Sequence, residues 1–290
     1  MVKTYADLYL DARKAMLRTD GVYASTLARE LLCAASGKSR EAVIADRELY
    51  ASEEICLKME NMVRRHLAGE PMAYLLGQWD FYDMTLTVTP DVLIPRDDTM
   101  AVTELAVKKA LFLDQNPRIL DLGTGSGCIG IAIARRVPDA KLTLADVSQA
   151  ALRVAKKNVA DLKLTGRAVC VSADMTKPAA PFLGKFDLIV SNPPYVTTAE
   201  METLDTSVRD YEPRLALDGG EDGLDYYRAI VRNFTSALRP GGWLALEFGM
   251  GQQDAVCAIL EAADYTVREL REDNSGIVRA VLAQHNEQSI

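Results

Sequence analysis

From residue 118 onward, the chain alternates between short apolar runs and amphipathic helical patterns. Strands separated by helices pair in parallel, because each crossover returns the chain to the same end of the sheet. This alternation most limits what the chain can fold into, and it predicts a mostly parallel sheet with helices on both faces. A helix is expected over residues 224–238, ended by Pro240-Gly241-Gly242. The expected strands are residues 118–122, 141–145, 168–172, 186–191, 243–248, 265–270 and 277–282.

The first expected strand ends in a glycine-rich turn. Gly123, Gly125 and Gly127 stand at every second position before a helix rich in Ala and Ile. Glycine permits positive φ and lets a ligand approach the backbone with no Cβ in the way, and the free N–H groups of the helix start attract a polar or anionic group. The spacing Asp-x-Gly-x-Gly-x-Gly differs from the dinucleotide pattern, which favours a ligand without a pyrophosphate. Asp121 adds a carboxylate suited to a ligand ammonium.

Acidic residues also follow the next two strands. Asp146 ends the second strand, where such sheets commonly carry the acceptor for ribose hydroxyls. Asp174 follows the third strand and is a candidate acceptor for an exocyclic adenine amine, with Met175 against the ring. Each acid alone is explained equally well as a helix cap or turn residue. Together with the glycine turn, they predict an adenosine pocket.

The fourth expected strand runs into Asn192-Pro193-Pro194-Tyr195. Neither proline has an N–H for the ladder, so the strand ends at the carboxyl edge, where open sheets bind ligands. The Asn192 side chain and the Pro193 carbonyl offer two adjacent acceptors, which suit a planar –NH2 group. Tyr195 adds an aromatic face. Taken alone, the motif is explained as well by a proline-rich turn with a structural asparagine, but the glycine turn upstream favours a site.

Residues 1–75 carry three helical patterns. Thr4 and Ser52 are expected N-caps, and Gly21 and Gly37 are expected to end helices. No motif in this region carries chemistry. A small helical domain is therefore expected, and it is assigned to substrate docking by elimination.

Composition limits the partners and the compartment. The formal net charge is −8, and residues 1–75 hold 11 basic and 11 acidic side chains, so neither part offers the basic surface that a phosphate backbone requires. Five scattered cysteines without a Cys-x-x-Cys pair indicate reduced thiols, and two histidines make a metal site unlikely. The chain shows no signal peptide and no apolar run of spanning length. We expect a cytoplasmic monomer with no metal, no membrane association and no stable nucleic-acid binding.

The strand-end motifs resemble those of class I S-adenosylmethionine-dependent methyltransferases. In that setting Asn-Pro-Pro-Tyr is similar to the motif of enzymes that methylate a planar nitrogen, either adenine N6 in DNA or glutamine N5 in protein. The segments 69–77, 93–99 and 212–224 resemble the peptide chain release factor N5-glutamine methyltransferase family. The resemblance covers about residues 65–285, and Met100 stands where the family usually has Glu.

The resemblance implies an α/β, Rossmann-like class I methyltransferase sheet, mostly parallel with an antiparallel last strand, preceded by a small all-α domain. The chain is expected to divide into a helical docking domain (1–75), a β-hairpin linker (76–98) and a methyltransferase domain (99–290). The resemblance also implies S-adenosylmethionine as cofactor, S-adenosylhomocysteine as product and class I release factors as protein substrates.

The motifs and the resemblance together define the expected site residues. The expected catalytic residues are Asn192, Pro193 and Tyr195. The expected cofactor-binding residues are Asp121, Gly123, Thr124, Gly125, Ser126, Gly127, Asp146, Asp174, Met175 and Asn192. The expected substrate-binding residues are Asn192, Pro193, Pro194, Tyr195 and Arg96. On spacing alone, Arg96 is better explained by a salt bridge at a helix start.

The expected chemistry follows from the amide. Its nitrogen is a poor nucleophile because the lone pair is delocalised, whereas a methyl sulfonium is a strong electrophile, so the protein mainly has to orient and desolvate. Asn192 and Pro193 are expected to accept both N–H groups, through bonds that strengthen as positive charge develops on the nitrogen. Two alternatives stay open. An adenine-N6 nucleic-acid methyltransferase would flip a base into a similar pocket, and a non-catalytic S-adenosylmethionine-binding protein would have a damaged Asn-Pro-Pro-Tyr.

Overall fold

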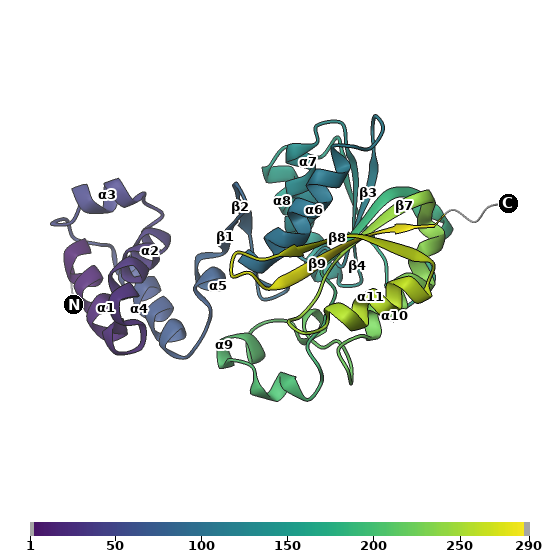
Figure 1. Cartoon of the computed structure of the whole chain (residues 1–290). Coiled ribbons are helices and arrows are strands. Elements are labelled where there is room, and N and C mark those ends of the chain that lie inside the picture. The colour runs from purple at the N-terminus through teal and green to yellow at the C-terminus, as the bar shows by residue number, and fades with distance from the viewer. Residues whose placement is uncertain (1–2, 287–290) are drawn as a thin grey trace. The chain divides into compact units, whose positions relative to one another are not determined.

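The computed structural model describes residues 3–286. The chain forms two compact units (Figure 1). The first ends at Gln78 and also contains Asp205–Tyr211, and the second comprises Trp79–Leu204 and continues from Glu212. In the part of the chain that the structure describes, no helix is long and apolar enough to cross a membrane.

The first unit is helical, and its helix ends follow from the sequence. Thr4 caps the first helix in a reciprocal pair with Asp7, and Ser52 caps the fourth. Gly21 and Gly37 end the first two helices with positive φ, as predicted. Apolar side chains of five of the helices form the core of this unit. The helices are α1 (Tyr5–Asp20), α2 (Ala24–Ser36), α3 (Arg40–Ala45), α4 (Glu53–Leu67), α5 (Met72–Leu76) and α9 (Thr206–Arg209).

The second unit is built on a seven-stranded sheet in the order β5-β4-β3-β6-β7-β9-β8. The strands are β3 (Arg118–Leu122), β4 (Lys141–Asp146), β5 (Ala168–Ser172), β6 (Phe186–Ser191), β7 (Leu238–Glu247), β8 (Tyr265–Glu272) and β9 (Val278–His285). The strands from β5 to β7 pair in parallel, and β9 lies antiparallel between β7 and β8. This confirms the predicted sheet. Beside β3 the direction in which successive strands are added reverses: β4 and β5 lie on one side of it and β6 and β7 on the other. Open sheets of this kind bind ligands at such a switch point.

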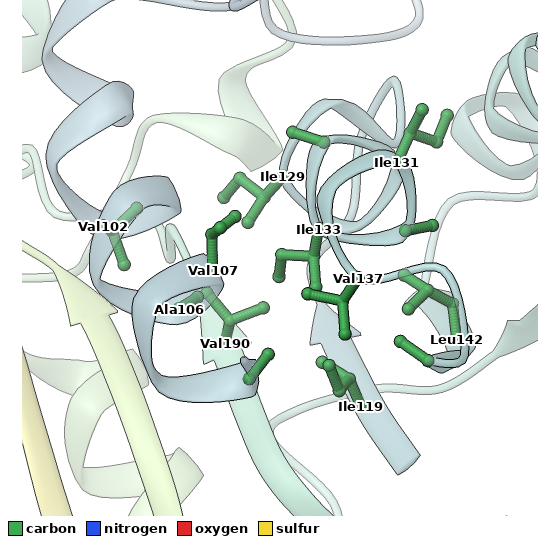
Figure 2. Packing of buried hydrophobic residues seen from close by; sticks show 14 of the residues in the cluster. Val102, Ala106, Val107, Ile119, Ile129, Ile131, Ile133, Val137, Leu142 and Val190 are labelled. Atoms are coloured by element: carbon green, nitrogen blue, oxygen red, sulfur yellow. The ribbon is translucent and has the colours of Figure 1, made fainter. Parts of the chain in front are cut away.

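Helices cover both faces of this sheet (Figure 1). Along β3, Ile119 belongs to the core on one face and Leu120 to the core on the other, because successive side chains of a strand point to opposite faces. Figure 2 shows the first core, in which Ala106, Ile133 and Val190 gather near Ile119. The helices on that face are α6 (Met100–Ala110), α7 (Cys128–Arg136) and α8 (Gln149–Asp161), and those on the other face are α10 (Asp225–Phe234) and α11 (Gln253–Ala262).

A two-stranded hairpin, β1 (Gln78–Phe81) and β2 (Met84–Thr87), lies within the segment expected to contain one. Its side chains Phe81, Met84 and Leu86 are buried in the same core as α6 and α7. The hairpin therefore contributes apolar side chains to the second unit.

One helix boundary differs from the prediction. The helix expected over residues 224–238 ends at Phe234, and β7 already begins at Leu238. The register between β6 and β7 is irregular there, so Pro240-Gly241-Gly242 lies in a bulge of the strand. A bulge tolerates a proline because the residues that it inserts leave the ladder of hydrogen bonds.

Gly130 of α7 lies so close to β4 that a side chain has no room. An ideal Cβ at this position would stand 2.3 Å from Leu144 Cδ2 and 2.9 Å from Leu142 Cδ1. We predict that Gly130→Ala lowers the free energy of unfolding by about 1–3 kcal/mol, because crowding a packed core outweighs the gain in helix propensity. Chemical denaturation measures this. The control is Gly166→Ala, in which the added methyl group meets no atom within 4 Å. Equal unfolding midpoints for the two variants would contradict the prediction.

Candidate active site

A pocket of about 300 Å³ opens at the carboxyl ends of β3, β4, β5 and β6. This volume is at the lower end of the range for small-molecule sites. The predicted site residues that line it are Gly123, Thr124, Gly125, Ser126, Asp146, Asp174, Met175, Asn192 and Pro194. The predicted residues outside this lining are Asp121, Gly127, Pro193, Tyr195 and Arg96.

Asp121 lies beneath the glycine turn. Its Oδ2 accepts hydrogen bonds from the Thr124 hydroxyl at 2.6 Å and from the Gly130 N–H at 2.9 Å. Burial raises the pKa of Asp121 to about 6, although both hydrogen bonds act to lower it. The buried Oδ1 has no hydrogen-bond partner within residues 3–286. The structure therefore gives Asp121 the role of fixing the turn, and its contact with a ligand ammonium stays a prediction.

Asp146 also holds the glycine turn while it borders the pocket. Its two oxygens accept the N–H groups of Gly125 at 2.9 Å and Ser148 at 2.8 Å. The carboxylate keeps a lone pair for a further donor. Burial raises the pKa of Asp146 above its ordinary value, against the three backbone N–H groups that lower it. Gly125 has φ +54°, a conformation that favours glycine.

The residues after β5 form a turn at the pocket edge. Asp174 Oδ1 accepts the N–H and the hydroxyl of Thr176, at 2.9 and 2.6 Å, and these bonds lower the pKa of Asp174. The Met175 side chain packs against Gly123, where an ideal Cβ would stand 2.8 Å from Met175 Cε. Gly123 is therefore required for this close approach. The contact of Asp174 with an adenine amine stays a prediction.

The Asn-Pro-Pro-Tyr turn leaves β6 beside β3, where the Ser191 hydroxyl donates to the Leu122 carbonyl at 2.6 Å. Asn192 lines the pocket, and its Nδ2 donates to Thr99 Oγ1 at 3.1 Å. Tyr195 is largely buried against the core around α10 and α11, and this burial raises the pKa of its hydroxyl above the ordinary value. Its carbonyl accepts the Gln252 side-chain N–H at 3.0 Å, which anchors the turn.

Glu247 lies beside the site, although no sequence motif singled it out. It ends β7 and is 1% exposed, and its carboxyl lies next to the side chains of Thr99 and Asn192. Its buried Oε2 has no hydrogen-bond partner among residues 3–286. Burial raises the pKa of Glu247 to about 8; nearby Asp98 adds to this rise, whereas Arg279 opposes it. The signal was present, because an acid at the end of an apolar strand is the same pattern that identified Asp146.

Asn158 of α8 was also missed. Its buried amide accepts the Thr87 N–H at 2.7 Å and donates to the carbonyls of Thr87 and Ser126, at 3.0 and 2.8 Å. One side chain therefore ties the end of the hairpin to the glycine turn. Its helical surroundings gave no sequence signal for this role.

Arg96 forms a salt bridge, although not with its neighbours in sequence. Its guanidinium pairs with the buried carboxylate of Glu212, which also accepts the Ile94 N–H at 3.0 Å. The pair joins the two chain segments that contain Pro95 and Pro213, both of which line the pocket. Contact of Arg96 with a substrate stays a prediction.

Comparisons with known proteins agree with this architecture. Residues 102–219 match the family model of the methyltransferase small domain, and residues 10–77 match that of the PrmC N-terminal domain. A release factor glutamine methyltransferase of Geobacter sulfurreducens is 37% identical to this chain, and the aligned region covers 94% of each of the two chains. One of Bradyrhizobium diazoefficiens is 40% identical over 89% of this chain and 86% of its own. The solved structure of a methyltransferase from Pyrococcus furiosus has the same fold, with a TM-score of 0.52 at 18% identity over 78% of this chain and 99% of its own.

The fold and the strand-end pocket define a class I methyltransferase. The identity to the curated relatives extends over nearly the whole chain. The chain belongs to the release factor glutamine methyltransferase family. This confirms the family that the motifs indicated, and it extends the match to the helical region.

We predict that Arg96→Met lowers the free energy of unfolding by about 1–3 kcal/mol, because a buried carboxylate loses its charged partner. Urea denaturation measures the change. The control Arg228→Met removes ion pairs with Asp222 and Asp225, whose side chains are exposed, and should cost less than about 1 kcal/mol. A loss no larger than that of the control would show that the Arg96 pair does not stabilise the fold.

Proposed function

We propose that this chain transfers a methyl group from S-adenosylmethionine to the side-chain amide nitrogen of glutamine in the Gly-Gly-Gln motif of peptide chain release factors. One observation carries the proposal: Asn192 lies on the wall of the same pocket as the glycine turn and Asp146. A group that binds a planar nitrogen is therefore adjacent to a site for a nucleoside. The names of the relatives indicate the same substrate class.

The lining fits S-adenosylmethionine. Asp146 has acceptor capacity left for ribose hydroxyls, and apolar groups such as Ile129 and Met175 offer a surface for the adenine ring. When bound, S-adenosylmethionine supplies a methyl group on a positively charged sulfur. The acidic side chains Asp146 and Asp174 suit that charge.

Asn192 and Pro193 would orient the substrate amide. Among residues 3–286, neither Asn192 Oδ1 nor the Pro193 carbonyl accepts a hydrogen bond. Two free acceptors match the two N–H groups of a glutamine side chain. As the nitrogen becomes positively charged during transfer, both bonds strengthen, so the residues stabilise the transition state without a dedicated base. We also propose that the helical unit docks the release factor, because it matches the N-terminal domain of the family.

We predict that Asp146→Ala weakens binding of S-adenosylmethionine by about 1–3 kcal/mol, because the ribose loses a charged acceptor. Isothermal titration calorimetry on the folded variant measures the affinity. Asp161→Ala serves as the control, since Asp161 is exposed at the end of α8 and pairs with Lys157. Equal affinities of the two variants would remove Asp146 from the cofactor site.

We predict that Asn192→Ala lowers turnover by about 10²–10³-fold while partner affinity changes little, as expected when one preorganised polar group is lost. Single-turnover methylation of a release factor measures the rate. The control is Asn274→Ala, which alters an exposed asparagine in the turn between β8 and β9. A wild-type rate in the Asn192 variant would mean that this side chain does not hold the amide.

The substrate class has its own test. Labelled S-adenosylmethionine is incubated with the protein and either a release factor or adenine-containing DNA. Label on the glutamine of the release factor supports the proposal. Label on DNA would instead support the adenine-N6 alternative, and label on neither would support a protein that binds the cofactor without catalysis.

A further inference from the structure

The amide group of Asn192 is held by two neighbouring side chains. Its Nδ2 donates to Thr99 Oγ1 at 3.1 Å, and the buried carboxyl of Glu247 lies next to it at the end of the neighbouring strand. A side-chain amide nitrogen carries two hydrogens, so one is donated to Thr99 and the second is available to the Glu247 carboxyl. In this orientation Oδ1 faces the pocket.

The Thr99 hydroxyl also lies next to the Glu247 carboxyl, and a hydroxyl has a single hydrogen. Because Thr99 Oγ1 uses a lone pair to accept from Asn192, its own hydrogen is available to Glu247. Glu247 keeps at least one acceptor oxygen in either protonation state, so the three side chains form one directed network.

The network decides which functional group the pocket can hold. If the Asn192 amide were turned over, Oδ1 would face the Thr99 lone pair and the Glu247 carboxyl, and Nδ2 would face the pocket. A pocket that presents Nδ2 would donate to a carboxylate or a carbonyl. A pocket that presents Oδ1 beside the Pro193 carbonyl accepts from an –NH2 group and repels a carboxylate, which has no hydrogen to donate.

We propose that Glu247, acting with Thr99, is a positioning residue that holds the Asn192 acceptor toward the substrate and so makes the site select an amide over a carboxylate. This inference rests on the proposed function for the identity of the substrate. The strand pairing supports the geometry, because Ser191 and Leu246 are paired across β6 and β7, which places Asn192 and Glu247 side by side at the ends of neighbouring strands.

Hydrogen exchange of the Asn192 side-chain amide tests the geometry without any catalysis. In the wild-type protein, both Nδ2 hydrogens should exchange slowly in NMR spectra, with the signals assigned by their loss in Asn192→Ala. In Glu247→Leu, which keeps the volume but removes the acceptor, at least one hydrogen should exchange about tenfold faster or more. Glu247→Gln keeps an acceptor and should retain protection. Equal exchange in wild type and Glu247→Leu would overturn the proposal.

A double-mutant cycle on turnover separates positioning from general damage. Glu247→Leu should lower the single-turnover rate about tenfold or more, with KM changed less than about threefold, and Glu247→Gln should restore most of the rate. In the Asn192→Ala background the same substitution should have no further effect, because no amide is left to orient. An equal loss in both backgrounds would assign Glu247 a structural role only.

The control for the cycle is Tyr227→Phe, which removes a 3.0 Å hydrogen bond to the Glu247 backbone carbonyl and leaves the carboxyl in place. Its effect should be the same in both backgrounds. If Glu247→Leu does not fold, Thr99→Val removes the other partner and should show the same coupling to Asn192. If the wild-type protein does not methylate a release factor, the proposed function fails, whereas the exchange measurement still decides the role of Glu247.

Discussion

The buried carboxylate of Asp121 is the interaction on which the rest of the site depends. It is the next-to-last residue of β3, the strand beside which the sheet order reverses, and it accepts from Thr124 in the glycine turn and from Gly130 in α7. One side chain therefore fixes a strand end, a turn and a helix start. Desolvation raises its pKa to about 6, and the two donors oppose that rise. The turn that these bonds hold lines the pocket.

Most of the fold and part of the site could be predicted because both depend on local patterns. The spacing of apolar residues along the chain predicts which segments are strands and which are helices. Parallel pairing then brings the carboxyl ends of β3, β4, β5 and β6 to one edge of the sheet. That edge rule identified Asp146 and Asn192, both of which line the pocket. The same rule would have singled out Glu247, whose position at the end of β7 follows the same pattern.

The contacts that were missed join residues far apart in the chain. Arg96 and Glu212 are separated by 116 positions, and Asn158 reaches 71 positions back to Thr87. Neither pairing leaves a periodic signal, because each joins segments that only the tertiary fold brings together. Arg96 illustrates the difficulty. A salt bridge was foreseen from its acidic neighbours, yet its partner is the buried Glu212 in a distant segment.

The electrostatics of the pocket favour a positively charged ligand. Burial raises the pKa values of Asp146 and Glu247, which means that the folded chain holds their protons more tightly than the unfolded chain does. For Glu247 this stabilisation is complete below the ordinary value of 4.5 and is lost as the pH rises toward about 8. At neutral pH the Glu247 carboxyl therefore resists ionisation. A cation bound beside Asp146 would oppose the desolvation that raises the pKa of this acid, and would so favour its charged state.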